Sequence, residues 1–121
     1  MKIATGKERR IHPRIDKQLP LNVVVNGYDF VTNTQNLSCL GTYCRIDKYI
    51  PPFTRVRIKL DLPVKKETCN VECDGVVVRT EDEDDGNFNI AIFFNRIKEL
   101  PKQRLTEYVG QFLERHQPSL H

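Results

Sequence analysis

The sequence predicts an all-β fold, a small six-stranded antiparallel β-barrel with one C-terminal α-helix and an extended N-terminal arm. Short stretches that alternate apolar and polar residues recur through residues 18–97, and turn-forming residues separate them. After Pro101 the apolar spacing changes from two to between three and four, which is typical of a helix. We therefore expect a single domain, with a basic arm at 1–17, the barrel at 18–97 and the helix at 101–116.

The size and composition of the chain suit one globular domain. Its 121 residues are 39% hydrophobic and 29% charged, and a chain of this length can bury its own core. No apolar run approaches the roughly 20 residues that a membrane helix requires, and the N-terminus lacks the apolar stretch of a signal peptide. We expect a cytoplasmic protein that does not insert into membranes.

The N-terminal arm concentrates positive charge. Residues 1–17 carry six lysines and arginines but only two acidic residues. They show no apolar periodicity, and Pro13 keeps the residue before it extended. This charge points to a phosphate-bearing partner. An arm that buries so little apolar surface is expected to be flexible when free.

The first hairpin begins after the arm. Asn26-Gly27 is typical of a type I′ turn, because both residues tolerate positive φ, so residues 28 to about 35 return as the second strand. Residues 36–41 then form a turn, where Gly41 permits a conformation or a close approach that a β-carbon would block. A third strand follows at 42–46. Alternating apolar residues mark the first strand: Leu19, Leu21, Val23 and Val25.

Three further strands and the helix complete the predicted fold. A half-buried strand covers 55–62, a strand with Gly75 as a bulge or bend covers 71–80, and residues 81–85 with Gly86 form an exposed turn. Residues 89–94 are almost continuously apolar, which predicts a strand buried on both faces. The helix shows apolar residues on one face: Leu105, Tyr108, Val109, Phe112 and Leu113.

Two polar clusters flank the first hairpin. Arg10 and Arg14 precede it with three residues between them, and Asn36-x-Ser38-x-x-Gly41 follows it. An arginine fork can bind a phosphate bidentately, pair with O6 and N7 of guanine, or stack on a purine. An asparagine offers donors and an acceptor to a base edge, and a serine hydroxyl can bind a phosphate or a base. We expect the arm and the turn to converge on one ligand.

This constellation resembles the PilZ-domain family, whose members are receptors for the bacterial second messenger cyclic dimeric GMP. The family pattern is Arg-x-x-x-Arg on an N-terminal arm, then Asp or Asn-x-Ser-x-x-Gly after the first hairpin. Residues 75–79 and 90–94 also look like the last two barrel strands of the family, so the resemblance covers about residues 8–113. It implies a six-stranded barrel with a C-terminal helix, as the residue pattern does.

The resemblance also implies roles for the site residues. Arg10 and Arg14 would contact guanine and phosphate, Asn36 and Ser38 would complete a guanine pocket, and Gly41 would keep the turn tight. Asparagine at position 36 lacks the charge-assisted acceptor that aspartate gives to guanine N–H groups, which predicts weaker binding.

The implied mechanism is ordering of the arm over the barrel by the ligand, which changes the face shown to an unidentified downstream protein. An arginine at the position of Arg9 goes, in this family, with a stacked ligand dimer. We therefore include Arg9 among the expected ligand contacts.

Two alternatives remain open from the sequence. One is a small barrel that binds single-stranded nucleic acid, although the aromatic residues are not interleaved with the basic arm as such binding requires. The other is a ligand-less adaptor of the same fold. We expect no enzyme, because no nucleophile elbow or phosphate-cradling loop is present.

The remaining polar residues suggest no second site. The cysteine spacings C-x4-C and C-x3-C depart from the usual zinc patterns, so we expect neither metal nor cofactor, and reduced thiols of which several pack in the core. His12 is expected in a solvent-exposed loop. Arg55, Arg57 and Lys59 are expected on a solvated strand face. Arg79 could support the site but is not included in it.

Overall fold

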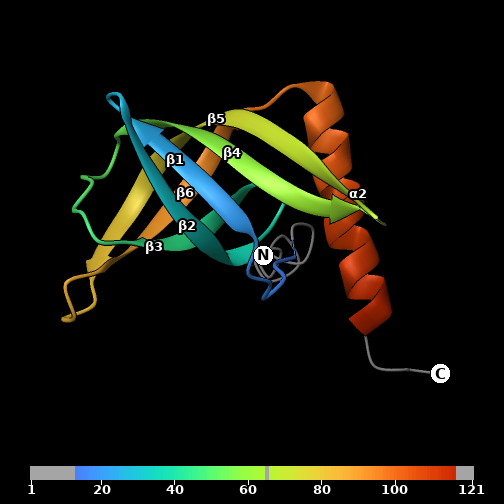
Figure 1. Cartoon of the computed structure of the whole chain (residues 1–121), viewed down its shortest axis with the longest axis horizontal. Coiled ribbons are helices and arrows are strands. Elements are labelled where there is room, and N and C mark those ends of the chain that lie inside the picture. The colour runs from blue at the N-terminus through green and yellow to red at the C-terminus, as the bar shows by residue number, and fades with distance from the viewer. Residues whose placement is uncertain (1–12, 65, 117–121) are drawn as a thin grey trace, which may run out of the picture.

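The described residues form a closed antiparallel β-barrel with helix α2 beside it (Figure 1). The computed structural model describes residues 13–64 and 66–116. The strands follow one another round the barrel as β1-β2-β3-β6-β5-β4, and β4 pairs with β1 to close it. The predicted fold class is confirmed. The elements are β1 Pro20–Val25, β2 Tyr28–Leu37, β3 Gly41–Ile46, β4 Arg55–Val64, β5 Glu67–Asp82, β6 Phe88–Arg96 and α2 Glu99–His116.

The barrel interior is filled by the apolar members of the alternating strands. In β1 the odd-numbered residues Leu21 and Val23 are fully buried, and in β4 Ile58 and Leu62 are as well. The residues between them face outward, as a period of two requires. The apolar alternation therefore identified the inward face of both strands correctly.

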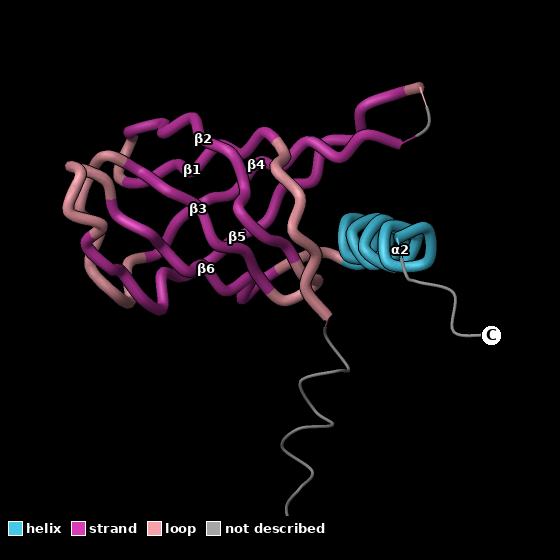
Figure 2. Tube along the Cα trace, turned by 90° about the horizontal axis from the view of Figure 1, so that it is seen from below, coloured by secondary structure: helices cyan, strands magenta, loops and turns pink. Residues whose placement is uncertain are grey.

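Helix α2 begins at Glu99, two residues earlier than predicted, with Pro101 in its first turn. Figure 2 shows the helix end-on beside the barrel. Leu105 and Val109 are buried in the common core. The guanidinium of Arg104 donates a hydrogen bond to the sulfur of Cys69 at the start of β5, at 2.8 Å. One apolar helix face thus covers the barrel, as its spacing predicted.

Two backbone features were predicted correctly from single residues. Asn26 and Gly27 both have positive φ, 49° and 85°, as a type I′ hairpin turn requires. At Gly75 the pairing of β5 with β6 shifts register between Asp74 and Val76. A β-carbon at Gly75 would lie 2.8 Å from Cγ2 of Ile92, so the irregularity coincides with a close packing contact.

Four strand predictions need correction. β2 runs on to Leu37, so Asn36 lies in a strand rather than in a turn. β4 runs on to Val64, and β5 extends beyond 71–80 at both ends, from Glu67 to Asp82. These extensions arise because pairing with a neighbouring strand outweighs the weak strand propensity of polar residues. β6 is not buried on both faces: Ile92 points inward, but Phe93 is 42% exposed on the outside. No helix covers that face in the described part of the chain, since α2 packs on β4 and β5.

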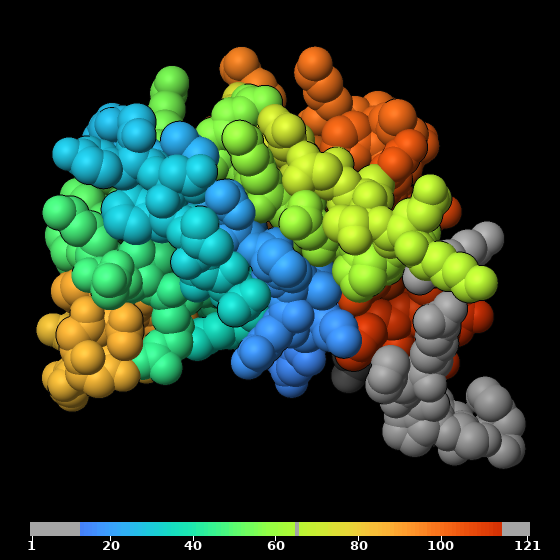
Figure 3. Space-filling view, in the orientation of Figure 1, coloured from blue at the N-terminus to red at the C-terminus, as the bar shows by residue number. Residues whose placement is uncertain are grey.

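The segment that leads into the barrel is anchored by Ile15. Its backbone exchanges two hydrogen bonds with Leu37, at 2.8 and 2.9 Å, and its side chain is only 2% exposed. Thr34 adds a second anchor, because its hydroxyl accepts from the N–H of Leu19 and donates to the carbonyl of Lys17. In Figure 3 this blue segment lies between the teal residues of β2 and the red helix. The predicted arm of residues 1–17 is thus held against the barrel at Ile15 and Lys17, because Ile15 buries its side chain there. Residues 1–12 lie outside the described residues, so flexibility of that part remains a prediction.

Two of the cysteines are core residues. Cys44 and Cys73 are buried, and burial raises the pKa of each thiol to about 12. Within the described ranges, no cluster of His, Cys, Asp and Glu side chains could hold a metal ion. No helix in those same ranges has the length and apolar character needed to cross a membrane.

Alkaline pH is expected to destabilise the fold through these two thiols. Their native pKa is raised above the ordinary value of 9.0, so the unfolded chain loses these protons first. The thiols therefore add no destabilisation below pH 9, and the free energy of unfolding falls as pH rises from about 9 towards 12. Urea unfolding across this range measures the slope. The Cys44→Ala/Cys73→Ala variant should show a shallower slope, and an unchanged slope would contradict the prediction.

Candidate functional site

The arm meets the end of β2 through Arg14. Its Nη1 donates a hydrogen bond to Oδ1 of Asn36 at 2.8 Å. The antiparallel bridge between Ile15 and Leu37 brings the arm alongside the end of β2. Arg14 and Asn36 are diagonal neighbours across this bridge, and the long arginine side chain spans the gap. Two of the predicted site residues, 22 positions apart in the chain, are therefore neighbours on the barrel surface.

Tyr43 on β3 lies next to both residues and was not predicted as part of the site. It pairs directly with Asn36 across the β2–β3 ladder. The guanidinium carbon of Arg14 lies 5.1 Å from the centre of the Tyr43 ring, and that of Arg79 lies 5.5 Å from it. Both are within the range of a cation–π interaction. Arg79 also donates a hydrogen bond to the Tyr43 hydroxyl at 2.5 Å.

A small residue on β6 makes the contact between Tyr43 and Arg79 possible. Ala91 of β6 pairs with Tyr43 on one side and with Arg79 on the other. Since its side chain is a single methyl group, the long arginine can cross β6 and reach the phenol. Arg79 also lies 3.9 Å from a carboxylate oxygen of Glu81. The site therefore extends across the four neighbouring strands β2, β3, β6 and β5. Arg14 of the arm packs on its β2 and β3 residues.

Ser38 holds the turn after β2 together. The residue is 1% exposed, and its hydroxyl accepts from the N–H groups of Leu40 and Gly41 at 3.1 and 3.3 Å. Its own N–H donates to the carbonyl of Gly41 at 2.9 Å. In this arrangement the hydroxyl satisfies the backbone of the turn. Its contact with a ligand stays a prediction.

Gly41 allows β3 and β6 to approach each other. A β-carbon at this position would lie 2.2 Å from the carbonyl oxygen of Ile92, far inside any normal contact. The residue has no positive φ, so the close approach, rather than the backbone conformation, is what requires glycine. The prediction that a β-carbon would be blocked here is confirmed.

Three other residues of the arm, Arg9, Arg10 and His12, lie outside the described residues. Of the three arginines expected to touch the ligand, only Arg14 is seen against the barrel. Binding of one ligand by both Arg10 and Arg14 therefore stays a prediction.

The Arg14–Asn36–Tyr43 site lies apart from two surface hollows, of about 370 and 330 Å³, on the described part of the barrel. None of its three residues lines either hollow.

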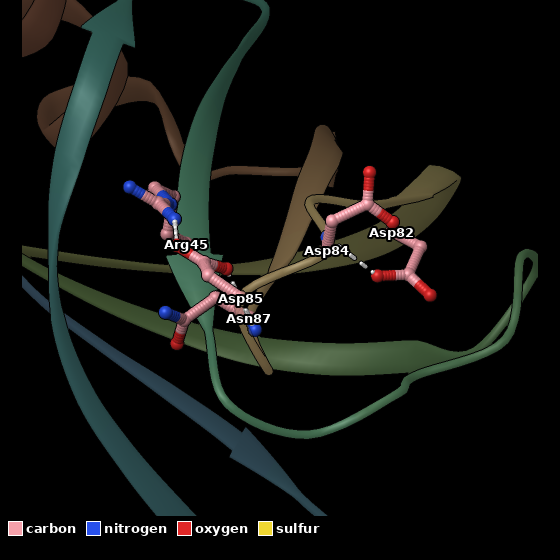
Figure 4. A network of polar contacts seen from close by, with 5 residues as sticks. All are labelled: Arg45, Asp82, Asp84, Asp85 and Asn87. Carbon is pink, nitrogen blue, oxygen red and sulfur yellow. Dashed lines mark hydrogen bonds and ion pairs between the residues drawn. The ribbon is translucent and has the colours of Figure 1, made fainter.

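Local contacts hold two carboxylates of the acidic turn between β5 and β6 (Figure 4). Asp85 forms an ion pair with Arg45, and its carboxylate accepts from the N–H of Asn87 at 3.1 Å. The hydrogen bond from Arg45 is the main reason that the pKa of Asp85 is lowered. The carboxylate of Asp82 accepts from the N–H of Asp84 at 2.9 Å. These contacts give the cluster a structural role in the turn.

The fold and the site together define a class: a small closed barrel whose N-terminal arm places an arginine beside an Asn-x-Ser-x-x-Gly segment. The chain belongs to the PilZ domain family, whose family model matches residues 8–111. No curated protein matches it by sequence.

Solved structures share the fold, among them the following two. One is the inhibitor of motility MotI/DgrA from Bacillus subtilis, with a TM-score of 0.81, 20% identity, and coverage of 90% of this chain and 53% of that one. The other is the PilZ domain of YcgR from Escherichia coli with c-di-GMP, with a TM-score of 0.61, 11% identity, and coverage of 92% and 99%. The chain thus spans about half the length of the MotI chain. At these identities the likeness concerns the fold.

Proposed function

We propose that this protein is a non-catalytic bacterial receptor for cyclic dimeric GMP, which binds on the Arg14–Asn36–Tyr43 site. The observation that carries the proposal is the contact of Arg14 with Asn36, because it joins the two separate halves of the family pattern. The membership of the chain in the PilZ family supports it. The YcgR domain, which has the same fold, was solved with c-di-GMP.

The site offers the chemistry that a guanine nucleotide needs. The Arg14 fork can turn from Asn36 to a phosphate or to the O6 and N7 atoms of guanine. The Asn36 amide is then released to pair with a base edge. The Tyr43 ring supplies a flat face on which a purine can stack, and Arg79 supplies a second fixed cation. Arg10 and Arg9 would add further guanidinium groups from the arm.

The ligand must displace the contacts that Arg14 already makes. One exposed hydrogen bond and one exposed cation–π contact cost about 1–2 kcal/mol to break. This corresponds to roughly a tenfold loss of affinity. This loss is small compared with the free energy gained from new charge-assisted bonds to the two phosphates of the ligand. The contacts that Arg14 makes in the free protein therefore hold it near the ligand site without preventing binding.

The signal is proposed to pass through the arm. Ile15 fixes the end of the arm next to the barrel, so a ligand that binds Arg14 and Arg10 would hold the preceding residues against the same surface. The covered surface would then differ between the free and the bound protein, which is what a downstream protein can recognise. If Arg9 also contacts the ligand, we expect two stacked ligand molecules to bind.

Calorimetric titration with cyclic dimeric GMP tests the proposal. We expect saturable binding of this ligand and much weaker binding of cyclic dimeric AMP, because adenine lacks the O6 acceptor. Two ligands per protomer would support the stacked dimer. Tighter binding of single-stranded RNA, lost at high salt, would favour the nucleic-acid alternative instead. Absence of any binding would leave the adaptor alternative.

Removal of the Tyr43 ring is expected to weaken ligand binding about tenfold, because stacking of one base on an aromatic side chain contributes roughly 1–3 kcal/mol. Tyr43→Phe should retain most of the affinity, since it keeps the ring and loses only the hydrogen bond from Arg79. Tyr49→Ala is the matched control, because it removes another surface tyrosine, which contacts Phe88 instead. Equal affinities of Tyr43→Ala and Tyr49→Ala would contradict a stacking role.

A further inference from the structure

A second group of arginines surrounds a hollow on another part of the barrel. The hollow has a volume of about 370 Å³. Two of its lining residues, Val56 and Gly75, are buried, and exposed side chains line its rim. The rim contains Arg55, Arg57, Asn95 and Arg96.

Strand register brings these residues together. Arg57 of β4 pairs with Asp74 of β5, and Asp74 pairs with Arg96 of β6. Arg55 lies two residues before Arg57, on the same outward face of β4. Residues from three strands therefore form one cluster, although they are up to 41 positions apart in the chain.

The cluster has more positive than negative charge. Arg57 is neutralised, because it forms ion pairs with Asp74 at 2.8 Å and with Glu72 at 3.5 Å. Arg55 and Arg96 form no ion pair with any of the residues that the structure describes. Two guanidinium groups at the rim are thus available to an external anion, and Asp74 and Glu72 hold the third, that of Arg57.

Apolar surface adjoins the charged rim. Arg55 pairs with Val76 on β5, and Val76 pairs with Phe93 on β6. Phe93 is 42% exposed, and Val78 close by on β5 is 50% exposed. Apolar groups flanked by charges are typical of surfaces that bind other proteins.

We propose that this hollow is a docking site for an acidic segment of a partner protein. Two carboxylates of the segment pair with Arg55 and Arg96, and a small apolar side chain between them enters the hollow. This site lies outside the Arg14–Asn36–Tyr43 site, and the proposal does not depend on the nature of the nucleotide ligand.

A peptide fits this charge pattern better than a nucleic acid does. A phosphodiester backbone binds best to a continuous positive surface. Here Glu72 and Asp74 lie within the cluster and would repel such a backbone. A peptide, by contrast, can place one carboxylate at Arg55 and another at Arg96 and carry no negative charge near Glu72 and Asp74.

The experiment titrates the full chain, labelled for NMR, with the capped peptide Gly-Asp-Val-Glu-Gly. A second peptide with Asn and Gln in place of Asp and Glu is the matched control. We expect saturable shifts of the side-chain resonances of Arg55 and Arg96 with the acidic peptide and none with its amide counterpart. Arg55→Glu/Arg96→Glu should weaken the binding about tenfold or more. Lys48→Glu/Lys102→Glu, an equal charge change at two other exposed sites, should not.

Several results would overturn the proposal. Thermal denaturation first verifies that the glutamate variants fold, as expected for exposed side chains. No saturable shift at the arginines would rule out the docking site. Tighter binding of inorganic pyrophosphate or of a single-stranded oligonucleotide would assign the hollow to a different ligand. If the protein self-associates and the Arg55→Glu/Arg96→Glu variant does not, the hollow would instead bind the acidic turn of a second copy, around residues 81–85.

Discussion

Replacement of Arg14 by alanine is expected to weaken the binding of cyclic dimeric GMP by about a hundredfold while the barrel stays folded. Hydrogen bonds from a charged group to a ligand contribute roughly 1.5–3 kcal/mol, and each 1.4 kcal/mol is a factor of ten. Arg14 is exposed, and the core contacts of its segment are made by Ile15 instead. Calorimetry measures the loss of affinity, and thermal denaturation measures the stability.

Arg55→Ala is the matched control for Arg14→Ala. It removes another exposed arginine at a distance from the proposed nucleotide site, so it should leave ligand affinity unchanged. Two outcomes would argue against the role of Arg14. One is full affinity in Arg14→Ala, which would remove Arg14 from the ligand contacts. The other is an unfolded Arg14→Ala barrel, which would make Arg14 a structural anchor.

Replacement of Gly41 by alanine is expected to destabilise the barrel by about 3 kcal/mol or more. The new β-carbon would lie 2.2 Å from the carbonyl oxygen of Ile92 and 3.3 Å from the Cα of Phe93. Both are backbone atoms, so no side chain can turn aside, and β3 must separate from β6. A loss of this size lowers the melting temperature by roughly 10 °C in a domain of this length.

The control for this variant is another glycine-to-alanine change. At Gly110 a β-carbon would meet nothing within 4 Å. Alanine there is expected to stabilise the helix by about 0.5–1 kcal/mol, because it restricts the unfolded chain and favours helix. Melting temperatures that move in the same direction in both variants would contradict the account of Gly41.

Much of the fold followed from local patterns in the sequence. The alternation in residues 55–62 fixed which face of β4 is buried, and Asn26-Gly27 fixed the first turn. The ends of β2 and β5 were not predictable in the same way. Polar residues such as Asn36 and Asp82 extend these strands only because a partner strand is present, and that information is not local.

The site could be predicted only in part for the same reason. The proximity of Arg14 and Asn36 followed from a pattern in which arm and turn flank one hairpin. The contact of Tyr43 with Arg79 depends on the register of three strands and on the small side chain of Ala91 between them. No residue pattern near Arg79 indicates this register.

Ser38 shows a different limit of sequence reasoning. Its position in the Asn-x-Ser-x-x-Gly segment suggested a hydroxyl directed at a ligand. The structure shows the same hydroxyl accepting from the backbone of Leu40 and Gly41. Serine suits both roles, because its oxygen can accept two hydrogen bonds and donate one. Residue type and spacing alone do not distinguish them.

The central claim is tested most directly by NMR titration of the full chain with cyclic dimeric GMP. The resonances of the Arg14 guanidinium, the Asn36 side-chain amide and the Tyr43 ring should shift together and saturate together, while those of Arg55 and Arg96 stay in place. Saturable shifts confined to other parts of the barrel, with Arg14 and Asn36 unaffected, would contradict the account.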